Sequence, residues 1–145
     1  MAIANVGGDK LVLNKEYVTT AADLADKTLI TAAGAAVSSG ALATGTAAYY
    51  GVIEKDTPSG GLATVKTHGI LEVLATGTVT KGSLVEALQG TVYANINGTK
   101  TSTRSCGVTN IASGYPVGKA MSTSDAYGTV LVAFFDSILG AQKVA

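Results

Sequence analysis

Charged side chains are scarce in this sequence, at 14% of residues against about a quarter in ordinary soluble domains. The 10 basic and 10 acidic residues are spread singly, and the densest basic region, Lys100 to Arg104, holds two positive charges among hydroxyl groups. Binding to DNA or RNA normally needs a clustered positive patch, so this distribution predicts no nucleic-acid partner. The longest stretch without charge, from Thr28 up to Glu54, is interrupted by Gly, Ser and Thr, and it predicts no membrane-spanning helix.

Cysteine, histidine and tryptophan are almost missing as well, with one Cys, one His and no Trp. A lone Cys106 excludes an internal disulfide, and it is predicted to be a small core residue because nothing near it in sequence would lower its pKa. His68 is expected at the surface or in an interface. The acidic residues lie far apart, and no Gly-x-Ser-x-Gly motif occurs. We therefore expect no catalytic residue, no cofactor and no metal site, and a protein that is not an enzyme, unless the fold assembles a site from distant residues.

What the sequence does contain is short apolar alternation interrupted by glycine. The pattern is clearest over Val65–Leu74, Gly82–Ala87 and Gly128–Phe135. A period of two is what a strand shows when one face is buried and the other is wet. The spacing of the breaks, about 8 to 12 residues, is typical of a small barrel or sandwich. The sequence predicts a mainly β protein with a single small β-barrel or sandwich domain over residues 28–135.

The breaks between strands and the two ends of the chain complete this expectation. Breaks are predicted at 56–61, Gly77, Gly82, Gly90 and Asn97–Gly98, the last being a strong two-residue hairpin signal. Residues 1–27 are expected to form an N-terminal arm or a short helix, with the helix over Thr20–Lys27. Residues 136–145 are expected to be a tail with a helical turn or an extended conformation. The first ten residues have no basic region followed by an apolar core, so they predict no signal peptide.

The order of these blocks resembles the small head-decoration, or capsid cement, proteins of tailed bacteriophages, a family long catalogued as of unknown function. That family shows a Ser-Gly turn, a Gly-Val pair opening a strand, a strand pair around a glycine, another glycine turn, and a Gly-x-Ala block before a terminal apolar strand. The corresponding segments here are Ser39–Ala43, Tyr50–Ile53, Val65–Leu74, Thr80–Val85, Val117–Ala120 and Gly128–Phe135. The resemblance covers about residues 28–135. The zone before Thr28 and the Thr- and Asn-rich segment 94–110 have no counterpart in it.

The resemblance implies a structural virion protein that binds the outer surface of a phage capsid and cross-links neighbouring capsomers. Its expected partners are the major capsid protein and itself, as a homotrimer that forms before or on the shell. Its expected location is the capsid surface of a virion assembled in the host cytoplasm. The scarcity of charge agrees with this, since a soluble protein with so few charges is expected to bury much of its surface in partners.

The N-terminal segment, residues 2–13, is expected to carry partner-binding residues. Its apolar side chains lie on both sides of Gly7–Gly8, which would let the first six residues swing by up to about 20 Å. The predicted contact residues are Ile3, Val6, Leu11, Val12 and Leu13. A first core strand is the alternative interpretation of the same segment.

Two other classes of function stay open at this point. The chain could be another virion subunit, such as a tail-tube or head-completion protein, which would form rings. It could also be a small β-barrel carbohydrate-binding module. Such modules usually present clustered aromatic residues, and the only adjacent pair here, Tyr49–Tyr50, is expected to pack within the structure.

Overall fold

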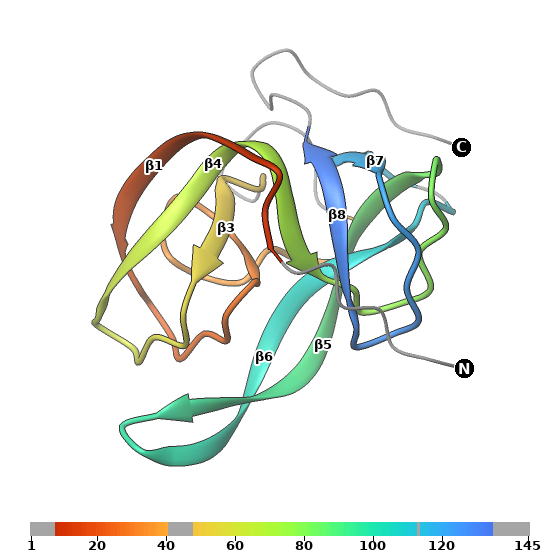
Figure 1. The fold of residues 1–145 in the computed structure, drawn as a ribbon. Coiled ribbons are helices and arrows are strands. Elements are labelled where there is room, and N and C mark those ends of the chain that lie inside the picture. The colour runs from red at the N-terminus through yellow and green to blue at the C-terminus, as the bar shows by residue number, and fades with distance from the viewer. Residues whose placement is uncertain (1–7, 41–47, 113, 135–145) are drawn as a thin grey trace.

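The computed structural model describes residues 8–40, 48–112 and 114–134, and every regular element in these ranges is a β-strand (Figure 1). The strands are β1 (Leu11–Thr19), β2 (Leu29–Ile30), β3 (Gly51–Glu54), β4 (Leu62–Leu74), β5 (Leu84–Ile96), β6 (Thr99–Asn110), β7 (Gly118–Ala120) and β8 (Thr129–Phe134). The prediction of a mainly β protein with one small domain is confirmed. None of the described residues belongs to a helix that could cross a membrane.

Strand β4 organises the sheet because it is long enough to pair with different strands along its length. Its N-terminal half lies between β1 and β3, and its C-terminal half pairs with β8. The main path of the sheet runs β2-β3-β4-β8-β7-β5-β6, and all of its pairings between strands are antiparallel. A bridge between Ala75 and Val108 brings β6 back to the end of β4, where Thr76 N–H donates to Val108 O at 3.1 Å. The result is a nearly closed antiparallel barrel.

The interior of this barrel is filled by small aliphatic side chains, as the alternation predicted. The largest buried cluster draws on β4, β5, β6 and β8, and it includes the fully buried Val73, Val85, Val108, Val130 and Val132. Each such side chain contributes about 1.5–3 kcal/mol when it is removed from water. Cys106 is a member of the cluster and is completely buried, which confirms its assignment to the core.

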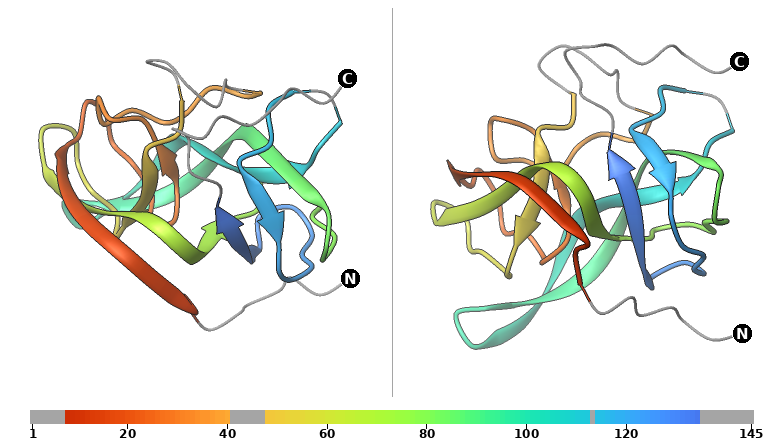
Figure 2. Two further views of the ribbon diagram at one scale, coloured as in Figure 1. Left: turned by 90° about the horizontal axis from the view of Figure 1, so that it is seen from above. Right: turned by 45° about the horizontal axis from the view of Figure 1, so that its top comes forward.

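The long β5–β6 hairpin leaves the barrel and projects beyond it, as the lower parts of Figure 1 and of the right view of Figure 2 show. Its turn is Asn97–Gly98, with φ of 52° and 83°, so the predicted hairpin turn is confirmed. The Thr- and Asn-rich segment 94–110, which has no counterpart in the resemblance, forms the end of β5, the turn and β6. Its inner face packs on the loop before β2, where Ala94 and Ile96 form a small buried cluster with Ala25.

The N-terminal zone differs from the predicted arm or short helix. The sheet starts at Leu11, well before residue 28, because β1 pairs with β4 along its length. Thr20–Lys27 forms no helix. The carboxylates that a short helix would leave in solvent accept backbone N–H groups from the β3–β4 turn instead, Asp23 from Ser59 and Asp26 from Lys55. A segment of under three turns has little helical stability of its own, so these contacts decide its conformation.

One predicted break is also wrong. Gly90 lies within β5 and is paired with Ser105, so the strand passes through it. A Cβ added at Gly90 would stand 3.3 Å from both a methyl of Thr76 and the hydroxyl of Tyr127. The glycine therefore allows close approach of neighbouring groups to β5 and makes no turn. The predicted tail, residues 136–145, lies outside the described residues.

Candidate functional site

Two surfaces stand out in the described part of the chain, and the first contains the predicted partner-binding residues of β1. Leu13 is 66% exposed and Leu11 is 46% exposed, whereas Val12 is half-buried and packs against the main core. Ile3 and Val6 lie outside the described residues. Leu11, Val12 and Leu13 belong to a paired strand, so within this segment the alternative of a first strand describes the structure.

The exposed apolar surface on β1 is larger than the sequence predicted. Tyr17 is 73% exposed, and Leu62, on β4, is 68% exposed. Thr19 is the register partner of Leu62, so Tyr17 and Leu62 are diagonal neighbours on one face of the sheet. We call Leu11, Leu13, Tyr17 and Leu62 the β1 strip. In the described part of the chain no strand pairs with the outer edge of β1, so the strip borders a row of unpaired backbone groups.

Side-chain contacts connect β1 with β3 and with Tyr50 just before it. Lys15 Nζ lies 3.0 Å from Glu54 Oε1 on β3, and the Tyr50 hydroxyl donates to the Glu16 carboxylate. The hydrogen bond to the carboxylate raises the pKa of Tyr50 above its ordinary value, with a smaller effect from burial. The strip is therefore presented on an ordered strand.

A buried contact fixes the chain just before β1. Asp9 binds the buried Lys66 ammonium at 2.7 Å and accepts the Glu72 N–H at 2.7 Å. These bonds tie the start of the described chain to β4, since Lys66 and Glu72 are both on that strand. Asp9 is therefore part of the folded domain, although it precedes the first strand.

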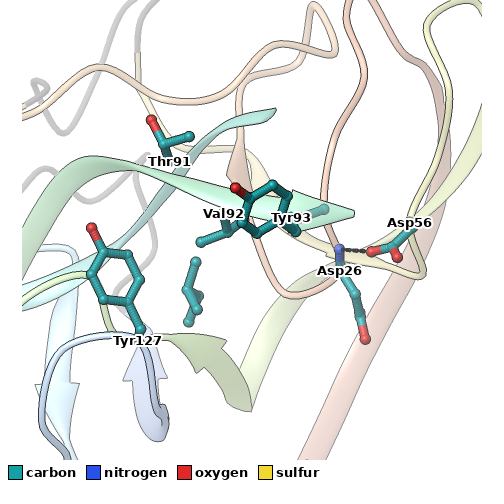
Figure 3. A pocket seen from close by; sticks show the side chains of 8 residues that line it. Asp26, Asp56, Thr91, Val92, Tyr93 and Tyr127 are labelled. Atoms are coloured by element: carbon teal, nitrogen blue, oxygen red, sulfur yellow. Dashed lines mark hydrogen bonds between the residues drawn. The ribbon is translucent and has the colours of Figure 1, made fainter. Parts of the chain in front are cut away.

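The second surface is a pocket of about 460 Å³ at the base of the projecting hairpin (Figure 3). It forms where segments far apart in sequence meet: the loop before β2, the β3–β4 turn, the end of β4, the middle of β5 and the turn before β8. Its lining residues are Ala25, Asp26, Asp56, Leu74, Thr91, Val92, Tyr93 and Tyr127. Figure 3 shows Tyr127 at one end and Asp26 and Asp56 at the other, with Tyr93 between them.

Asp56 holds the acidic end of this pocket together. One of its oxygens accepts the Asp26 N–H and the other accepts the Asn95 N–H, both at 2.8 Å. The Asp26 carboxylate in turn pairs with the Lys27 ammonium at 2.8 Å. Burial alone would lower the pKa of Lys27, but the hydrogen bond to Asp26 and the charges of Asp26, Glu72 and Asp9 together raise it. Lys27 therefore stays protonated and compensates the charge of Asp26.

Unusual backbone conformations gather around the pocket. Among the described residues, four other than glycine have positive φ, and three of them are Lys27 (65°), Lys55 (64°) and Tyr127 (67°). Lys27 and Lys55 adjoin the lining residues Asp26 and Asp56, and Tyr127 is itself a lining residue. Such conformations cost side-chain-bearing residues about 1–3 kcal/mol and are enriched at functional sites. This conformational strain could not be inferred from the sequence, because Lys and Tyr carry no signal for positive φ.

His68 and Tyr49, the other residues considered in the sequence, belong to neither the β1 strip nor the pocket lining. His68 is exposed and its Nδ1 lies 3.0 Å from the Thr67 hydroxyl. Tyr49 is buried against Phe134, with ring centroids 5.7 Å apart, as expected for a packing residue. In residues 8–40, 48–112 and 114–134, no group of three or more His, Cys, Asp or Glu is placed to hold a metal ion.

Comparisons of the chain with protein-family models, with curated proteins and with solved structures give no match.

Proposed function

We propose that this protein is a structural virion component that binds the outer surface of a phage capsid and stabilises it by cross-linking neighbouring capsomers. The observation that carries the proposal is the β1 strip, an apolar surface on an ordered strand whose outer edge has no partner in the described part of the chain. Exposed apolar groups beside an open strand edge are typical of surfaces that are covered by another protein.

The proposed partner for this surface is the major capsid protein. An open edge can accept an extended segment of a partner through backbone hydrogen bonds, while the side chains of the strip supply apolar contact. A shell offers the same partner surface many times, so each docked copy can bind modestly and the assembly can still be strongly stabilised. The order of glycine-bounded blocks along residues 28–135 supports the same class of protein.

The proposal includes self-association as a homotrimer, formed before or during docking. The low content of charged residues, 14%, supports it because charged residues are depleted where subunits meet. The solution mass, measured by light scattering, should correspond to three chains, or three copies should cluster at each site on a shell. Monomers both in solution and on the particle would contradict the trimer.

Co-sedimentation with empty heads tests the capsid interaction. The heads would be assembled from the major capsid protein encoded in the same genome. The double variant Leu13→Glu/Tyr17→Glu should bind at least about tenfold more weakly, because it places two charges in the apolar contact. Ser102→Glu is a matched control, since Ser102 is exposed on the projecting hairpin away from the strip.

Three results of this experiment would count against the proposal. The proposal is contradicted if the unmodified protein remains in the supernatant, if the double variant sediments as well as the unmodified protein, or if electron microscopy shows rings in place of decorated heads. Rings would favour the tail-tube or head-completion alternative.

A further inference from the structure

The pocket at the base of the hairpin has an open strand edge as one of its walls. Odd-numbered residues of β5 direct their backbone groups away from β6: Val85 O and Ala87 O accept N–H groups of Val117 and Gly40, and the Gln89 N–H donates to Ser39 Oγ. Further along, the Asn95 N–H donates to Asp56.

Between Gln89 and Asn95, this edge has no strand partner in the described part of the chain, and β7 pairs with β5 only at Leu84 and Val85. The strand alternation directs the N–H and C=O groups of Thr91 and Tyr93 to this side. These groups can serve a ligand as hydrogen-bond donors and acceptors.

Two tyrosines frame this open stretch. Tyr93 is 66% exposed and Tyr127 is 52% exposed, and a Cβ added at Gly90 of β5 would stand 3.3 Å from the Tyr127 hydroxyl. An aromatic ring offers a flat apolar face with negative partial charge, which suits the C–H groups of a sugar ring. The pocket volume of about 460 Å³ lies within the range of small-molecule sites, about 300–1,000 Å³.

The backbone of Tyr127 gives a separate reason to assign it a function. A bulky residue with φ of 67° is an outlier, and glycine would adopt this conformation without strain. The Tyr127 N–H is bonded to Ala75 O at the end of β4, so the turn is held in place. A half-exposed ring adds little to the core, and the conformational strain is therefore explained if the ring contacts a ligand.

Charges of both signs lie around the pocket. The lining residues Asp26 and Asp56 are negative, Lys27 Nζ lies 2.8 Å from the Asp26 carboxylate and 3.9 Å from that of Glu72, and the Lys100 ammonium lies 4.6 Å from the centre of the Tyr93 ring. An anionic ligand would meet carboxylates, and a cationic one would meet ammonium groups. This arrangement favours a neutral ligand rich in hydroxyl groups.

We infer that the pocket bounded by Tyr127, the open edge of β5 at Thr91 and Tyr93, and Asp56 binds a neutral saccharide. The rings contact the apolar face of the sugar, while carboxylates and the β5 backbone exchange hydrogen bonds with its hydroxyl groups. This site is separate from the β1 strip, so it adds a second binding activity to the proposed capsid protein and does not depend on it.

A printed array of neutral and acidic glycans, followed by NMR titration with the best neutral glycan, tests the inference. Neutral glycans should bind, and the amide signals of Thr91 and Tyr93 should shift. Tyr127→Gly should weaken binding by at least about tenfold while raising the melting midpoint, because it removes the ring and relieves the backbone together. Tyr17→Ser is the matched control, an exposed tyrosine on the β1 strip whose loss should leave glycan binding unchanged.

A merely structural role for Tyr127 would not combine higher stability with lost binding. The inference is overturned if no neutral glycan binds, if acidic glycans bind in preference, or if Tyr127→Gly binds as well as the unmodified protein. It is also overturned if an extended peptide shifts the Thr91 and Tyr93 amides and the glycans do not, since the edge would then be a strand-addition site. Binding of Tyr127→Gly to empty heads separates the two proposals, because capsid attachment should persist in this variant.

Discussion

The single cysteine shows how burial of one group changes the dependence of stability on pH. Burial raises the pKa of the Cys106 thiol from its ordinary value of 9.0 to about 12, against a smaller opposing effect of its hydrogen bond with the Leu88 backbone. The folded state thus holds this proton more tightly than the unfolded state does. The corresponding stability is fully present below pH 9.0 and is lost as the pH rises toward about 12.

We therefore predict that the free energy of unfolding falls by about 1–1.5 kcal/mol more in the unmodified protein than in Cys106→Val between pH 8 and pH 10. Urea unfolding at the two pH values measures this difference. The raised pKa values of Tyr50 and Lys27 act in the same direction, but they are present in both proteins and cancel. Equal slopes for the two proteins would contradict burial as the cause.

Gly107 is a residue at which the fold leaves no space for a side chain. A Cβ there would lie 2.2 Å from Leu74 O, where β6 approaches the end of β4 and the barrel closes. Gly107→Ala should reduce the free energy of unfolding by about 3 kcal/mol or more, because backbone must move to admit the methyl group.

Gly98→Ala serves as the comparison for this substitution. Gly98 has positive φ, at 83°, which Gly107 does not, and no atom lies within 4 Å of an added Cβ. This change should cost only about 1 kcal/mol, from backbone conformation alone. Equal losses in the two variants, measured by urea unfolding, would show that the contact at Gly107 relaxes without cost.

At the scale of elements, the projecting hairpin depends on one carboxylate for its position. Asp56 accepts N–H groups from Asp26 and Asn95, and so it joins the loop before β2 to the end of β5. Asp56→Ala should lower the free energy of unfolding by about 1–3 kcal/mol, because two backbone donors lose their acceptor.

Hydrogen exchange gives the sharper test of this effect. The Asn95 amide should lose protection in Asp56→Ala, whereas amides of the barrel strands such as Val130 should change only with the global stability. If protection of the Asn95 amide follows global stability alone, the hairpin is held by its apolar contacts with Ala25 and the role given to Asp56 is wrong.

The strands and turns also show which parts of the fold could be predicted from the sequence. Asn97–Gly98 was predictable because the left-handed turn is specified by the two residues themselves. The helix expected over Thr20–Lys27 failed because Asp23 and Asp26 bind a turn more than 25 residues away in sequence. The break predicted at Gly90 is wrong for a similar reason. The small size of Gly90 allows close approach of Thr76 and Tyr127, and it does not serve a local turn.

The two candidate surfaces also differ in how far the sequence alone could predict them. Leu11 and Leu13 could be chosen from the sequence as candidate contact residues because they are apolar and close together in the chain, and both are exposed in the structure. The pocket was not predictable, because Asp26, Asp56, Tyr93 and Tyr127 meet only after the sheet has closed. Looking for aromatic residues that are adjacent in the sequence misses Tyr93 and Tyr127, because they are separated by more than 30 residues. The positive φ of Tyr127, which supports the proposed ligand site, is known only from the backbone of the structure.

In the molecule as a whole, the N-terminal segment is part of the folded domain at Asp9, because Asp9 pairs with the buried Lys66 and accepts the Glu72 N–H. Ile3 and Val6 precede this anchor. If they form part of a docking arm, removing them should affect attachment without affecting the fold.

We predict that deletion of residues 2–8 leaves the melting midpoint unchanged and weakens co-sedimentation with empty heads. Ordering an arm on a shell costs about 1–2 kcal/mol per residue in backbone entropy, so its apolar side chains must be buried there to give net affinity. Asp9→Ala is the contrasting variant. It should lower the melting midpoint, because a buried ammonium without its partner costs about 3–5 kcal/mol. A truncated protein that fails to fold, or one that binds heads as strongly as the full chain, would show that residues 2–8 are not a docking arm.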